Sequence, residues 1–167
     1  SSASAVFMGQ YGLSQQQFSY AFAMNAGGIM LMSSLNKHLN TRMDIFPRLR
    51  LGGTIQCFGA LIVVSAGLMN HAPLWLLMSG LFLVVSGIGL TGPNAMALAM
   101  SKQGARAGTA SAIMGSMQFA CGLLGGVILN FLIWKASLNM GLMMLMFTSA
   151  GLFAIFKVGK QQDSIFS

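Results

Sequence analysis

The chain has 167 residues, of which 55% are apolar and only 7% are charged, so it lacks the charges that cover a soluble domain. Its net charge of +7 does not indicate a nucleic-acid partner, because the basic residues gather at the ends of apolar runs rather than among aromatic residues in a polar groove. The composition excludes a soluble fold and predicts an all-α integral membrane protein.

The apolar runs predict a single membrane domain over residues 1–167. A helix needs about 20 residues to cross roughly 30 Å of hydrocarbon. Five runs are long enough, at residues 15–35, 51–69, 74–97, 107–133 and 138–156. Residues 1–9 are too short to cross and are interpreted as the end of a helix whose beginning is missing, and residues 157–167 as a tail.

Residues at the ends of these runs support the limits. Ser14 and Gln17 have the spacing of a capping box, which satisfies two backbone donors at a helix start. Pro47 and Pro73 precede the second and third runs, where the missing N–H of proline costs little. The sequence therefore predicts helix starts at these places.

The basic residues predict the orientation in the bilayer. Only Lys135 lies in the connections on one side, whereas the other side carries Lys37, Arg42, Arg48, Arg50, Lys102, Arg106, Lys157 and Lys160. Short cytoplasmic loops of membrane proteins carry the excess of Lys and Arg. We therefore expect the C-terminus in the cytoplasm and the N-terminal residues on the outer face.

No Asp, Glu, Lys, Arg or His lies inside the five predicted spans. The acids are Asp44 and Asp163, both outside them, and His38 and His71 lie at opposite ends of the membrane. The spans therefore offer no carboxylate pair, no nucleophile with a base and no set of metal ligands. We expect neither an enzyme nor a bound metal or cofactor.

Uncharged polar residues do lie within the spans, namely Asn25, Thr54, Gln56, Asn94, Ser111, Ser116 and Gln118. Such a residue either hydrogen-bonds to a neighbouring helix or lines a cavity, where it orients a ligand without a buried charge. Helical spacing places Phe22 on one face with Asn25, and Gln118 on one face with Gly115 and Gly122. An aromatic and amide surface facing a glycine-rich surface would suit a pocket.

Small residues predict close helix packing in the fourth span. A small residue recurs there at every fourth position, as Gly108, Ala112, Ser116 and Ala120, and Gly122 and Gly126 form a GxxxG pair. Such residues let helix backbones approach closely in lipid. The fourth span should therefore pack tightly against a neighbour.

The third span ends in a sequence that predicts a kink. Gly89, Gly92 and Pro93 lie close together before Asn94. Proline lacks the N–H that would bond to the carbonyl of Gly89, and its ring strains the preceding turn. Kinked helices beside polar residues occur in transporters, so this segment is a candidate moving part.

Several motifs resemble those of one transporter family. They are the run GPNAMALAM from Gly92, the run AGTASAIMG from Ala107 with Gln118 and Phe119, and YGLSQQQF from Tyr11. Together they resemble the C-terminal half of the Bcr/CflA drug-resistance transporters of the major facilitator superfamily. The likeness covers most of the chain, with the motifs in the same order.

The resemblance implies a twelve-helix fold, in which residues 1–9 end helix 7 and the five spans are helices 8 to 12. It implies proton-driven antiport of hydrophobic or amphipathic drug-like compounds, as in antibiotic resistance, across a bacterial inner membrane. Helices 7, 8, 10 and 11 line the substrate cavity in such proteins. The candidate cavity residues are therefore Asn25, Asn94 and Gln118, with Phe22 and Phe119 beside them.

The resemblance also places the proton-coupling residues in an N-terminal half that this chain lacks. We therefore expect no transport by the chain alone, unless it pairs with that half or with a second copy. Two alternatives stay open: a small membrane accessory or interaction protein without transport activity, and a membrane-embedded enzyme that would need acid/base groups the spans lack.

Overall fold

The computed structural model describes residues 12, 14–69, 71–101 and 136–163, and scattered positions at 108, 109, 112, 113, 115–117, 120, 123, 124 and 127. Its long helices are α2 (Gln15–Leu39), α3 (Ile45–Leu68), α4 (Leu74–Ser101) and α6 (Ala136–Asp163). No strand occurs among the described residues. The predicted helical class is therefore confirmed for the described part of the chain.

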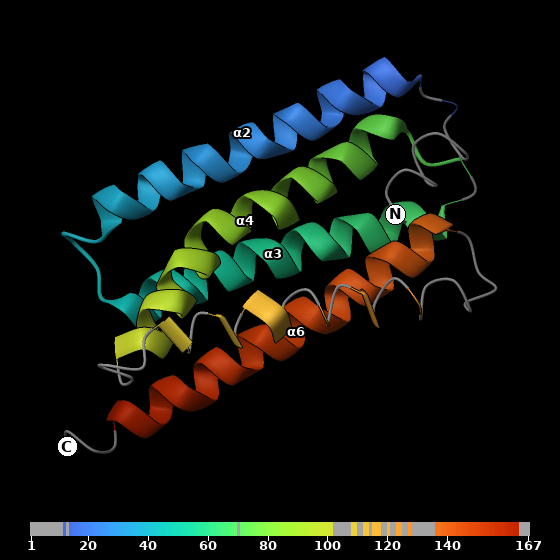
Figure 1. The fold of residues 1–167 in the computed structure, drawn as a ribbon. Coiled ribbons are helices and arrows are strands. Elements are labelled where there is room, and N and C mark those ends of the chain that lie inside the picture. The colour runs from blue at the N-terminus through green and yellow to red at the C-terminus, as the bar shows by residue number, and fades with distance from the viewer. Residues whose placement is uncertain are drawn as a thin grey trace.

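These helices pack as a row in which α3 and α4 hold the middle positions. The main contacts join α2 to α4, α4 to α3, and α3 to α6, and Figure 1 shows the helices side by side in the order α2, α4, α3, α6. The apolar core includes Val63 of α3, Leu77 and Leu81 of α4, and Met140 of α6. Of these three neighbouring pairs, one (α3 and α4) joins successive helices of the chain, and the other two join helices that are further apart in the sequence.

The start of α2 is fixed by the predicted capping box. The backbone N–H of Gln17 donates to Ser14 Oγ at 3.2 Å, and the backbone N–H of Ser14 donates to Gln17 Oε1 at 3.0 Å. Both bonds satisfy donors that have no partner within the helix. The predicted start at residue 15 is confirmed.

The helices extend beyond the predicted spans. The helix α3 begins at Ile45 rather than at residue 51, so Pro47, Arg48 and Arg50 lie in its first turns. The helix α2 continues to Leu39, α4 to Ser101 and α6 to Asp163, so much of the predicted tail is helical. Hydropathy marks where a chain crosses hydrocarbon, whereas backbone hydrogen bonds continue a helix into the interface.

Three helices of the described chain are long and apolar enough to cross a membrane, at Ile45–Leu68, Leu74–Ser101 and Leu138–Gly159. The helix α2 has a sufficient length of 25 residues but a more polar composition. The predicted end of helix 7 at residues 1–9 lies outside the described residues, and so does most of the predicted span at 107–133. The number of five crossings therefore stays a prediction.

Glycine allows α4 to approach both of its neighbours closely. A Cβ atom at Gly59 of α3 would lie 2.7 Å from the carbonyl oxygen of Gly80 in α4. A Cβ atom at Gly89 of α4 would lie 2.6 Å from the carbonyl oxygen of Ile29 in α2. Since the obstacle in each case is backbone, a larger residue would push the helices apart.

Candidate functional site: a polar seam between α2 and α4

Polar groups join three helices where α2 ends, α3 begins and α4 passes its proline. The side-chain oxygen of Asn36 accepts two hydrogen bonds, from Arg48 Nη1 at 3.1 Å and from Asn94 Nδ2 at 2.8 Å. Arg48 is 6% exposed and Asn94 is 3% exposed. We call Asn36, Arg48 and Asn94 the polar cluster, and it links residues that lie up to 58 positions apart. We call the contact between α2 and α4, to which Asn36 and Asn94 belong, the seam.

The guanidinium of Arg48 is held by neutral oxygen atoms. Besides its bond to Asn36, its Nε donates to the backbone carbonyl of Asp44 at 3.3 Å. The carboxylate of Asp44 is exposed and makes no ion pair with Arg48. A buried guanidinium requires hydrogen-bond acceptors, because each N–H left without one costs about 1–3 kcal/mol or more. The buried position of the Arg48 guanidinium therefore depends on its hydrogen bond to Asn36.

Pro93 lies inside α4, and side chains cover the backbone carbonyls around it. The hydroxyl of Ser33 in α2 reaches the carbonyl oxygen of Gly89 at 3.5 Å, which is a long contact. Asn94 Nδ2 donates to the carbonyl oxygen of Leu90 at 2.7 Å. Figure 1 shows the path of α4 turning in its C-terminal part. The seam thus supplies donors where proline removes one.

Two buried polar atoms further along the seam have no hydrogen-bond partner among the described residues. They are Oδ1 of Asn25, a residue that is 8% exposed, and Oγ of Ser86, which is 1% exposed. Ser86 lies against Gly28, where there is no room for a Cβ atom. An unsatisfied polar atom is costly in an apolar environment. Asn25 belongs to α2 and Ser86 to α4, so both atoms lie in the contact between these two helices.

The structure brings two of the predicted cavity residues, Asn25 and Asn94, onto the face of the seam. Asn94 Nδ2 donates to both Asn36 and Leu90, whereas Oδ1 of Asn25 has no partner among the described residues. Phe22 is 68% exposed, and its ring centroid lies 6.5 Å from that of Phe18. Gln118 and Phe119 lie outside the described residues, so a shared pocket with them stays a prediction.

The predicted packing glycines differ in their surroundings. Gly89 is in close contact with α2, but a Cβ atom at Gly92 would meet only Ile88 of its own helix, at 3.7 Å. A Cβ atom at Gly108 or Gly115 would meet nothing within 4 Å. The further predicted positions, Gly122 and Gly126, lie outside the described residues.

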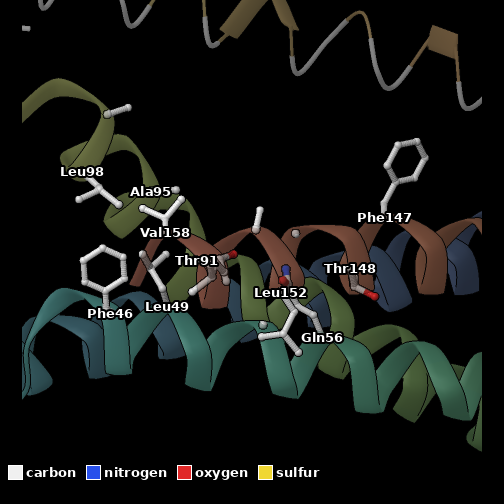
Figure 2. A pocket seen from close by; sticks show the side chains of 15 residues that line it. Phe46, Leu49, Gln56, Thr91, Ala95, Leu98, Phe147, Thr148, Leu152 and Val158 are labelled. Atoms are coloured by element: carbon white, nitrogen blue, oxygen red, sulfur yellow. The ribbon is translucent and has the colours of Figure 1, made fainter. Parts of the chain in front are cut away.

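An apolar groove of about 560 Å³ lies between α3, α4 and α6, and its lining does not include the predicted cavity residues. Figure 2 shows side chains from the three helices around it, and the lining comprises Phe46, Leu49, Gly53, Gln56, Thr91, Ala95, Leu98, Ala99, Phe147, Thr148, Gly151, Leu152, Ala154, Ile155 and Val158. A second cavity, of about 530 Å³, is lined by Met24 of α2 and by α4 residues that include Trp75 and Phe82.

The sequence did not predict the polar cluster. The apolar runs place Arg48 in a loop with the other cations and Asn36 beyond the end of the first span. A usable signal was present, because Asp44 is a suitable N-cap and proline is tolerated in the first helical turn. A helix start at Ile45 would have placed Arg48 one turn inside α3.

Comparison with curated proteins identifies relatives of the chain. It is 31% identical over 123 residues to a bicyclomycin resistance protein homolog of Haemophilus influenzae, and 32% identical over 123 residues to the uncharacterized MFS-type transporter YdgK of Bacillus subtilis. The chain is a relative of the major facilitator drug-resistance transporters. This confirms the family resemblance seen in the motifs.

The matched region covers 74% of this chain but only 31% and 30% of the two relatives, so the chain spans less than a third of the transporters it matches. No family model matches the chain, and no solved structure matches it. The polar cluster and the seam therefore belong to a chain that is similar to part of these relatives, and what a whole transporter does is a separate question.

Proposed function

We propose that the chain is the C-terminal part of a proton-driven multidrug or small-molecule efflux transporter of the bacterial inner membrane. The observation that carries this proposal is the match to the bicyclomycin resistance protein homolog over 123 residues. The three apolar helices of span length support a multi-pass membrane protein. The excess of basic residues in the connections favours a cytoplasmic C-terminus.

Asn25 is our first candidate for contact with the substrate. Its side-chain oxygen is buried with no partner in the part of the chain that the structure describes, and the exposed ring of Phe22 lies one helical turn away. An amide next to an aromatic ring suits an amphipathic compound, which offers both a polar atom and an apolar surface. Asn94 already has partners and is a weaker candidate, and Gln118 and Phe119 remain proposals from the sequence.

We further propose that the chain does not transport alone. The only acids in the sequence, Asp44 and Asp163, lie outside the apolar spans, and proton coupling in a membrane generally needs an ionisable group within one. The coupling groups would then belong to an N-terminal half, or transport would require a second copy of the chain. Catalysis is not part of this proposal, because the named relatives are transporters.

Drug accumulation in a susceptible bacterium tests the proposal. The chain is produced alone and together with the N-terminal half of its bicyclomycin resistance relative, and intracellular drug is measured before and after the proton gradient is collapsed. We expect gradient-dependent efflux only from the pair. Efflux by the chain alone would refute the required partner, and no efflux by a correctly inserted pair would refute the transporter assignment.

The candidate residue is tested in the same assay. Asn25→Ala should reduce efflux by the pair about tenfold, whereas Asn40→Ala, at an exposed position after α2, should have no effect. If Asn25→Ala leaves efflux unchanged, Asn25 is not a substrate contact. If, in addition, the chain co-purifies with a stable partner that does not restore efflux, the alternative of an accessory membrane protein is supported instead.

A further inference from the structure

We propose that the apolar groove between α3, α4 and α6 binds one acyl chain of an anionic phospholipid, with the lipid phosphate at Arg50. Arg50 lies in the second turn of α3 beside the C-terminal part of α6. This proposal concerns how the chain sits in its membrane and does not depend on transport. It rests on the groove's length and lining, on the state of Arg50, and on the charge balance of the chain.

The groove has the dimensions of one leaflet. Along α3 it extends from Phe46 to Gln56, which corresponds to about 15 Å at 1.5 Å per residue, or half of a hydrocarbon core of roughly 30 Å. Its volume of about 560 Å³ lies within the range of ligand sites. It therefore runs from the N-terminal end of α3 to about the middle of the predicted membrane.

The lining suits a hydrocarbon chain. It consists mainly of aliphatic and aromatic side chains, and its two threonine hydroxyls are already bonded within their own helices. Thr91 Oγ1 donates to the carbonyl of Gly87, and Thr148 Oγ1 donates to the carbonyl of Met144. The amide of Gln56 is the remaining polar side chain of a lining that is otherwise apolar, so an apolar occupant is favoured.

Arg50 marks the end of the groove at which a headgroup would lie. Its guanidinium carbon lies 4.9 Å from the centre of the Phe156 ring, and its Nη2 lies against Gly159, next to Phe46 of the groove lining. Its Nε is buried and donates no hydrogen bond to any described residue. Arg50 as a whole is half-buried, and a phosphate accepting from its guanidinium would supply the acceptors that Arg50 lacks in the described part of the chain.

The charge of the chain favours an anionic lipid over a neutral one. Nine basic residues face only two acids, so most cations have no counterion within the sequence. Lys157, which is exposed on α6 one residue from Phe156, adds a second positive charge near Arg50. Basic pockets between transmembrane helices on the cytoplasmic side bind anionic headgroups. The predicted orientation places Arg50 on that side.

Native mass spectrometry of the whole chain tests the site, with phosphatidylglycerol and phosphatidylcholine of identical acyl chains as probes. We expect phosphatidylglycerol to be retained at least tenfold more strongly. Arg50→Gln should lower this retention about tenfold, whereas Arg42→Gln, which removes an exposed cation from the connection between α2 and α3, should change it less than twofold.

A second pair of variants tests the acyl-chain site. Ala154→Phe places a large ring in the groove at an exposed position, and Ala150→Phe places the same ring one turn earlier on α6, outside the lining. Only Ala154→Phe should displace the lipid. Equal retention of the two lipids, or equal effects of Arg50→Gln and Arg42→Gln, would overturn the headgroup assignment. Lipid binding unaffected by Ala154→Phe would overturn the groove assignment and indicate that protein fills the groove.

Discussion

Replacing Asn36 by leucine should destabilise the protein far more than its position at the end of a helix suggests. The side-chain oxygen of Asn36 is the acceptor for both Arg48 and Asn94. Leucine has a similar size but no acceptor, so the bond from Asn94 is lost at a net cost of about 1 kcal/mol. Asn94 keeps its second acceptor, the carbonyl of Leu90, and is not left unsatisfied.

The larger cost comes from Arg48. Its Nη1 would remain buried without the acceptor that Asn36 provides, and an unsatisfied charged donor costs about 2 kcal/mol or more. Together these losses give a destabilisation of about 3 kcal/mol. The free energy of unfolding in mixed micelles, followed by circular dichroism as the fraction of denaturing detergent rises, measures it. Asn40→Leu, one turn later and exposed, should stay within about 0.5 kcal/mol of the parent.

A double substitution separates the cost of the lost hydrogen bond from the cost of a guanidinium that is left without its acceptor. In Asn36→Leu with Arg48→Met no guanidinium remains to be satisfied, so the double variant should be about 1–2 kcal/mol more stable than Asn36→Leu alone. If the effects of the two single substitutions simply add, or if Asn36→Leu costs no more than Asn40→Leu, Arg48 does not depend on Asn36.

Three further substitutions test the packing, the helix start and the proline. Gly59→Leu should cost about 2 kcal/mol or more because its side chain meets the backbone of Gly80, whereas Gly92→Leu, at an open position, should cost under about 1 kcal/mol; similar unfolding free energies would contradict the close approach. Ser14→Ala should weaken the start of α2 by about 1 kcal/mol and speed amide exchange at Gln17 about fivefold, and unchanged exchange would show that the cap contributes nothing. Pro93→Ala should lengthen the distance between spin labels at the two ends of α4, since a backbone donor to the carbonyl of Gly89 returns, and an unchanged distance would exclude Pro93 as the cause of the turn.

The sequence predicted those features of the fold that depend on local chemistry. The capping box at Ser14 is a short-range pattern with one structural solution, and it occurs as predicted. The helical class followed from the long apolar runs, because such a run crosses lipid as a helix, in which the backbone groups bond to one another. The helix ends were less well predicted, because hydropathy falls at the membrane surface while α3 and α6 continue beyond it.

The polar cluster could not be predicted from spacing alone. Asn36 and Asn94 lie 58 positions apart, and nothing local to either residue indicates that α2 and α4 are neighbours. Arg48 was grouped with the loop cations because positive charge usually lies outside spans. That rule locates the charge relative to the membrane, but it does not say whether the side chain is exposed or buried.

The contacts on the two sides of Pro93 constrain how α4 can move. Before the proline, the backbone of Gly89 lies against that of Ile29, and after it Asn94 is bonded to Asn36. Both partners belong to α2, so the segments of α4 before and after the proline are attached to the same helix. A bend at Pro93 that changes during a functional cycle must therefore carry α2 along or break one of these contacts. Breaking the second would cost Asn94 its hydrogen bond to Asn36, so joint movement of α2 and α4 is the less costly path.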